Sequence, residues 1–130
     1  MTKRLIALGT LTCLASAPLV ATAPAAHAVW TPMVRIDGAR SLVCKVPLGD
    51  GRTRVKVRLD NRNADHTHIG GLSRTRGDQQ ASVEVRAAAG QVSATKSLIW
   101  KRGDQLSTGI GEPSGEGAGT GFPISAVARC

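Results

Sequence analysis

The sequence predicts a single all-β domain, an antiparallel β-sandwich of immunoglobulin-like type with about seven or eight short strands and one disulfide. Apolar and polar side chains alternate with a period of two along several segments, which is typical of strands with one buried face. Turn signals separate these segments at intervals of roughly 8–13 residues, a spacing that suits a sandwich or a barrel. Two cysteines, Cys44 and Cys130, follow the predicted leader and allow one intramolecular bridge.

The first 28 residues have the features of a secretory signal peptide. They contain a charged start (Lys3 and Arg4), an apolar run and an A-x-A-type cleavage site at Ala26-His27-Ala28. We therefore expect a secreted, extracellular domain over residues 29–130, in an oxidising environment that favours disulfides. No later apolar stretch approaches the roughly 20 residues that a membrane span needs, so we expect none.

Strands are expected over the segments 33–37, 41–48, 52–60, 67–73, 81–89, 92–101, 105–110 and 122–129. The segment 52–60 shows the clearest alternation, with Val55, Val57 and Leu59 on one face and four cations on the other. The segment 81–89 repeats the pattern with Val83, Val85 and Ala87 directed inward. No segment has convincing helical periodicity.

Turns are predicted where glycine and aspartate interrupt the alternation, because glycine adopts positive φ and aspartate bonds its own backbone. The positions are Asp37-Gly38, Gly49-Asp50-Gly51, Gly70-Gly71, Gly77-Asp78, Gly90-Gln91 and Gly103-Asp104. Of these, Asp50-Gly51 and Gly90-Gln91 are expected to be hairpin connections. The sequence Arg-Gly-Asp-Gln occurs twice, at 76–79 and 102–105, and we interpret both copies as turns rather than as adhesion motifs.

The segment Gly109–Gly121 carries six glycines and a proline. Such a composition predicts a long flexible loop between the last two strands. A mobile connection without function and an adaptable binding loop are equally compatible with it.

The two remaining cysteines are expected on core faces of their strands. Alternate residues of a strand share a face. Cys44 therefore lies on one face with Leu42, Val46 and Leu48, and Cys130 lies on one face with Phe122, Ile124, Ala126 and Ala128. This arrangement predicts a Cys44–Cys130 bridge through the interior of the sandwich. Free thiols or a disulfide-linked dimer are the alternatives, since Cys130 is the last residue, but we expect a monomer.

A basic stripe is the main functional candidate. Arg52, Arg54, Lys56 and Arg58 alternate along one strand, so they project from one face at spacings of about 7 Å. Such a row could meet the phosphates of teichoic acid, nucleic acid or anionic lipid. The alternative is a solvated outer face that Glu84 and Asp60 partly neutralise. Two tryptophans, one phenylalanine and no tyrosine leave few stacking platforms, which disfavours nucleic acid.

Two histidines are the candidates for metal binding. His66 and His68 would share a strand face, but zinc needs three or four ligands. A third would have to come from Asp65, Asp60 or another strand. Because two close histidines in a polar loop are usually solvent-exposed, we predict no metal and no cofactor.

The sequence thus predicts a small secreted, non-enzymatic binding protein whose basic face meets an anionic cell-surface polymer or an acidic protein. The net charge of +8 is consistent with such partners. One alternative is an inhibitor or toxin-like effector that acts through residues 109–121. Another is a small hydrolase or metal-dependent enzyme centred on His66 and His68. No catalytic motif accompanies the serines, so we expect no enzyme.

Overall fold

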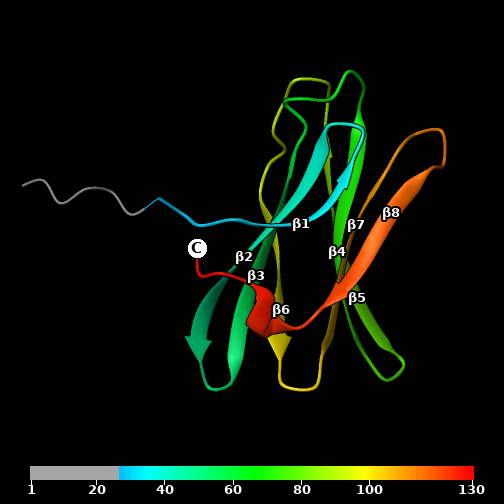
Figure 1. The fold of residues 1–130 in the computed structure, drawn as a ribbon. Coiled ribbons are helices and arrows are strands. Elements are labelled where there is room, and N and C mark those ends of the chain that lie inside the picture. Colours follow the sequence, from blue (N-terminus) through cyan, green and yellow to red (C-terminus); the bar gives the residue numbers. More distant parts are fainter. Residues whose placement is uncertain (1–26) are drawn as a thin grey trace, which may run out of the picture.

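The computed structural model describes residues 27–130 (Figure 1), so the first 26 residues of the predicted leader lie outside the described part. The described chain forms eight strands and one short 3₁₀ helix. The strands are β1 (Thr31–Ile36), β2 (Ala39–Gly49), β3 (Arg52–Asp60), β4 (His68–Arg76), β5 (Gln79–Ala87), β6 (Lys96–Lys101), β7 (Gln105–Gly111) and β8 (Gly117–Phe122); the helix is η1 (Ile124–Ala126). In this part of the chain, no helix has the length and apolar character that crossing a membrane requires.

The predicted antiparallel sandwich is confirmed. Sheet A has the strand order β1-β2-β3-β6 and sheet B the order β5-β4-β7-β8, with every neighbouring pair antiparallel. The core between the sheets is mainly aliphatic, and its buried members include Val43, Val55, Val57, Leu59, Leu72, Val85, Leu106 and Ile110. The predicted inward face of β3 is therefore correct.

Leu42 and Cys44 of β2 are buried, as predicted, but their side chains do not lie on the face that meets sheet B. Val43 lies opposite the core residue Val57, whereas Cys44 lies opposite Lys56 and Leu42 opposite Arg58. Directly opposite residues share a face, so Leu42 and Cys44 lie on the outer face of sheet A. The sequence alone could not show which face meets sheet B, because this segment has apolar residues at both odd-numbered and even-numbered positions.

The predicted disulfide between Cys44 and Cys130 is present, with 5.1 Å between the two Cα atoms. It does not cross the interior of the sandwich. The pairing of β1 along β2 begins at Val43, and the C-terminal tail continues along the same edge of β2. The Lys45 amide donates to the Ala128 carbonyl at 2.9 Å, and the Cys130 amide donates to the Lys45 carbonyl at 3.0 Å. The bridge thus fastens the tail sideways to sheet A, and Cys130 is exposed.

The predicted loop 109–121 and the predicted strand 122–129 are both wrong. β7 continues to Gly111, β8 begins at Gly117, and only residues 112–116 connect them. The glycines of both strands fall at every second position, so they share one face, as in the pair Gly109–Gly119. A Cβ on Gly117 would lie 2.8 Å from the Ile110 carbonyl oxygen, so the close approach of the two strands requires glycine there.

Pro123 explains why the last predicted strand is absent. Proline lacks the backbone N–H that a sheet needs, so β8 stops at Phe122 and η1 follows. The alternation expected for Ile124, Ala126 and Ala128 is lost, and Val127, which is 2% exposed, packs into the core instead.

Two predicted turns also differ. Gly70 and Gly71 lie inside β4, where a Cβ on Gly70 would lie 3.2 Å from a Val85 methyl group. Gly90-Gln91 is not a hairpin, because β5 belongs to sheet B and β6 to sheet A, so residues 88–95 cross between the sheets. The other predicted turns are confirmed.

Both Arg-Gly-Asp-Gln copies form turns, as predicted. Gly77-Asp78 connects β4 to β5, and Arg102–Asp104 connects β6 to β7. The Asp104 carboxylate is buried and accepts hydrogen bonds from the Arg76 guanidinium at 2.6 Å and the Lys101 amide at 2.8 Å. The aspartate of the second copy therefore makes hydrogen bonds within the protein and is not exposed to a partner.

Asp60 carries a buried charge at the end of β3, and we predict a large cost for its neutralisation. Its side chain accepts hydrogen bonds from Arg62, at 2.9 Å from both Nε and Nη2, and from Arg40. The Arg62 and Arg40 guanidinium groups hold the pKa of Asp60 well below its ordinary value despite burial. Asp60→Asn is expected to lower the free energy of unfolding at pH 7 by about 3 kcal/mol, because two guanidinium groups lose their partner.

The pH dependence of this effect has a definite sign. The folded-state pKa lies below the unfolded one, so the stabilisation is complete above the unfolded pKa of about 3.9 and is lost as pH falls towards the folded value. The difference in unfolding free energy between wild type and Asp60→Asn, measured by urea unfolding, should stay constant from pH 7 to about pH 5 and shrink as the pH falls below about 4. The exposed Asp78→Asn is the control and should change little. A difference that stays constant with pH would contradict this account.

Candidate functional site

The predicted basic stripe lies on the outer face of sheet A. Arg52 and Arg54 are exposed, and Lys56 and Arg58 are half-buried. The register adds one cation that sequence reasoning missed, since Lys101 of β6 lies directly opposite Arg52. No local signal in the sequence could have found Lys101, because its position depends on which strand pairs with β3.

The predicted neutralisation of this stripe does not occur. Asp60 is engaged by Arg40 and Arg62, and Glu84 belongs to β5 of the other sheet. Within residues 27–130, no ion pair involves any of the four predicted cations or Lys101.

Arg58 differs from the other cations. Its guanidinium carbon lies 4.3 Å from the centre of the Trp30 ring, a cation–π contact that holds the N-terminal segment against sheet A. Arg58 is therefore assigned a structural contact. The remaining set, Arg52, Arg54, Lys56 and Lys101, is called the basic face below.

The two histidines meet two carboxylates at one rim of the sandwich. His66 lies in the β3–β4 connection and His68 is the first residue of β4. Asp37 comes from the β1–β2 turn, and Glu112 directly follows β7. One ligand-type atom from each of the four side chains lies within 4.8 Å of the others, and these residues are called the rim cluster below.

The geometry of the rim cluster is centred on Glu112. Its Oε1 lies 3.1 Å from His66 Nε2 and 3.4 Å from His68 Nε2. The two imidazole rings lie 4.4 Å apart at an angle of 35°. His68 is fully buried, so the expectation of two solvent-exposed histidines is wrong for this residue.

Neighbouring groups orient the cluster. His66 Nδ1 lies 2.5 Å from Asp65 Oδ1, and Ser114 Oγ donates to Glu112 Oε2 at 3.2 Å. The Asp65 carboxylate, and after it the Glu112 carboxylate, raises the pKa of His66. The contact between the two carboxyl groups lowers the pKa of Glu112 to about 2 and raises the pKa of Asp37 above its ordinary value.

A tight turn delivers Asp37 to this rim. Asp37 and Gly38 have φ values of 43° and 83°, and Ile36 pairs directly with Ala39. Two-residue turns with positive φ at both positions match the twist of antiparallel strands. Gly38 packs against the Asn63 backbone, which places the turn beside the connection that carries His66.

Sequence reasoning found two members of the rim cluster and missed the other two. Asp37 was assigned only a turn, and Glu112 fell in the segment predicted to be a loop. The suggested third ligands were Asp65, Asp60 or a residue of another strand. Asp65 contacts His66 Nδ1, on the other side of the ring, and Asp60 pairs with arginines, whereas Glu112 comes from the end of β7. No spacing rule connects positions 37, 66 and 112, because three turns in different parts of the chain supply them.

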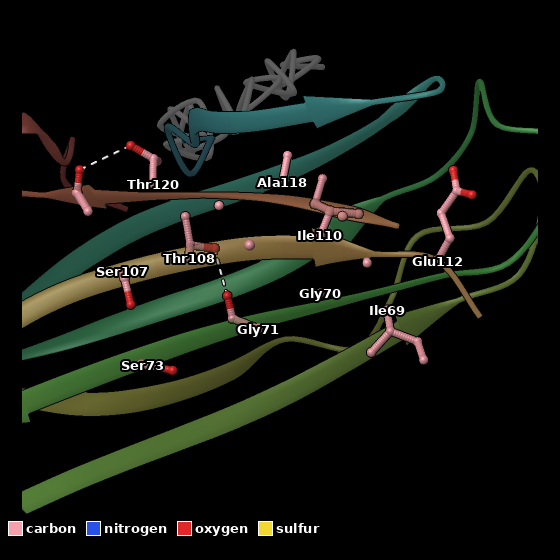
Figure 2. Close-up of a pocket in the computed structure, with 15 residues that line it drawn as sticks. Ile69, Gly70, Gly71, Ser73, Ser107, Thr108, Ile110, Glu112, Ala118 and Thr120 are labelled. Carbon is pink, nitrogen blue, oxygen red and sulfur yellow. Dashed lines mark hydrogen bonds between the residues drawn. The ribbon is translucent and has the colours of Figure 1, made fainter. Parts of the chain in front are cut away.

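A shallow groove of about 730 Å³ follows β4, β7 and β8 (Figure 2), with Glu112 among its lining residues. Much of its lining is backbone, because seven glycines contribute to it: Gly70, Gly71, Gly109, Gly111, Gly117, Gly119 and Gly121. The Thr108 hydroxyl donates to the Gly71 carbonyl at 2.7 Å and lies 2.6 Å from Ser41 Oγ, so it is engaged in hydrogen bonds that link the two sheets.

The chemistry available to the chain is therefore of two kinds: an array of cations on a sheet face, and a nitrogen and oxygen donor set at the rim. No protein-family model, curated protein sequence or solved structure matches this chain, so its function is argued from these two sites alone.

Proposed function

We propose that this protein is a secreted, non-enzymatic binding module that attaches to a phosphate-bearing cell-surface polymer through the basic face. The observation that carries the proposal is the direct pairing of Arg52 with Lys101. Like charges directly opposite each other destabilise a sheet, and no acidic side chain of the described chain pairs with either of them. A bound polyanion would offset this repulsion.

The spacing of the cations supports an extended ligand. Alternate residues of β3 lie about 7 Å apart along the strand, and the neighbouring strand lies about 5 Å away. A chain with one phosphate per repeat could meet Arg52, Arg54 and Lys56 in succession. Arginine adds two-point hydrogen bonding to phosphate, and the net charge of +6 that remains after Lys3 and Arg4 leave with the leader increases the encounter rate.

Two further features support this class of partner. Trp30 already contacts Arg58, so it is not an open stacking platform of the kind that single-stranded nucleic acid uses. The disulfide suits an oxidising compartment, which is where a surface polymer would be met.

The double variant Arg54→Ser/Lys101→Ser tests the proposal with purified teichoic acid as the probe. Affinity is expected to fall by about tenfold or more. The slope of the logarithm of the binding constant against the logarithm of salt concentration should decrease by about two, because about two fewer counterions are released. Titrations at several salt concentrations measure both quantities.

The matched control is Arg35→Ser/Arg86→Ser, which removes two exposed arginines from β1 and β5. It lowers the net charge equally, so it separates a local face from overall charge. Equal losses of affinity in the two double variants would show that the basic face is not the binding site. Affinity that does not change with salt concentration would show the same. Tighter binding to duplex DNA than to teichoic acid would contradict the proposal that the partner is a cell-surface polymer.

A further inference from the structure

We propose that the rim cluster of Asp37, His66, His68 and Glu112 is a binding site for a divalent transition metal, with Zn²⁺ as the ion that fits best. Two imidazole nitrogens and two carboxylate oxygens form a donor set that zinc accepts readily. The site is independent of the basic face, which lies on the outer side of sheet A.

The first support is the separation of the donor atoms. Zinc binds histidine nitrogen and carboxylate oxygen at about 2.0–2.2 Å, so two donors of a tetrahedral site lie about 3.3 Å apart. The distances from Glu112 Oε1 to His66 Nε2 and His68 Nε2 are 3.1 and 3.4 Å. Both distances from Glu112 Oε1 therefore match the spacing of neighbouring corners of one coordination shell.

The second support is that these atoms do not satisfy one another. His66 Nε2, both ring nitrogens of His68 and Glu112 Oε1 are buried and make no hydrogen bond within the described chain, although Glu112 lies within reach of both rings. A buried polar atom without a partner destabilises the folded state, because it has lost its hydrogen bonds to water. One ion between the groups would satisfy both Nε2 atoms and the carboxylate oxygen together.

The third support comes from the groups behind the donors. Asp65 accepts from His66 Nδ1–H, which leaves the Nε2 lone pair free to face the cluster. A carboxylate behind a histidine ligand is a common arrangement in metal sites. Ser114 plays a similar part for Glu112, because it holds Oε2 and leaves Oε1 directed at the histidines.

The charges balance for a divalent ion. Asp37 and Glu112 together bring two negative charges, and two neutral imidazoles add none. Asp37 closes the shell from an exposed turn and needs only a small displacement, since its donor atom lies within 4.8 Å of the rest. Four protein ligands are characteristic of a structural zinc site. The ion would connect the β1–β2 turn of sheet A to the β7–β8 turn of sheet B.

Calorimetric titration of the untagged protein with Zn²⁺ alone tests the site. We expect one ion per chain in the wild type and an affinity at least 100-fold lower in Glu112→Gln and in His66→Ala. Glu116→Gln, five residues from the end of β7, is the matched control for Glu112→Gln and should stay within about threefold of wild type. Asp65→Asn should weaken binding by about 10–100-fold without removing a ligand.

A second readout covers variants that fold poorly. Co²⁺ bound to the wild type should give the visible absorption of tetrahedral nitrogen and oxygen coordination, and Asp37→Asn, in an exposed turn, should change that spectrum. Absence of saturable Zn²⁺ binding would overturn the proposal. Wild-type affinity in folded Glu112→Gln would overturn it as well, since it would place the ion elsewhere.

Discussion

Cys130→Ser is expected to lower the free energy of unfolding by about 4–5 kcal/mol, because the bridge closes a loop of 86 residues in the unfolded chain. Cys130 is the better position for this test, since it is exposed whereas Cys44 is fully buried. The substitution at Cys130 therefore removes the bridge without opening a cavity in the protein. Urea unfolding measures the change.

Reduction of the wild type supplies the control for this prediction. Wild type in reductant should unfold at the urea concentration that unfolds Cys130→Ser, and reductant should leave the variant unchanged. The tail is expected to loosen first, because the bridge and two backbone hydrogen bonds hold it on Lys45. A loss below 1 kcal/mol would show that packing of the tail, with Val127 in the core, suffices without the covalent link.

Gly38→Ala is the second substitution with a large expected effect, a loss of about 3 kcal/mol or more. The φ of Gly38 is +83°, which costs a residue with a side chain about 1–2 kcal/mol. In addition, the new Cβ would lie 2.1 Å from the Asn63 carbonyl oxygen, a distance at which the backbone must move. The β1–β2 turn would then separate from the connection that carries His66.

Gly77→Ala separates the two causes. Gly77 also has a positive φ, +53°, but a Cβ there would meet nothing within 4 Å. Gly77→Ala should therefore show the cost of the backbone conformation alone. The loss of unfolding free energy in Gly38→Ala minus that in Gly77→Ala, both measured by urea unfolding, gives the cost of the contact with Asn63. Equal losses at Gly38 and Gly77 would show that contact with Asn63 contributes nothing to stability.

These two tests concern the features that hold the candidate sites in place. The disulfide secures the tail on the outer side of sheet A, which also carries the basic face. Gly38 places Asp37 beside His66 and thus determines whether the rim cluster has its fourth donor. A weakened turn should for this reason reduce Zn²⁺ affinity as well as stability.

The sequence alone determined the class of the fold and much of the strand pattern. The alternation of Val55, Val57 and Leu59 identifies a buried face, because the two-residue period is a local property of extended backbone. The turn at Asp37-Gly38 follows from residue chemistry for the same reason. The partner of Cys44 followed from counting the cysteines.

The tertiary structure decided the rest, namely which face of β2 meets sheet B, which cation faces Arg52, and which carboxylates join His66 and His68. β8 was hidden because alternating glycines were interpreted as flexibility, although a paired neighbour supplies hydrogen bonds that glycine accepts as readily as any residue. Strand register and the approach of turns arise from contacts between segments far apart in the chain. Local patterns do not encode those contacts, so only the folded chain shows both sites.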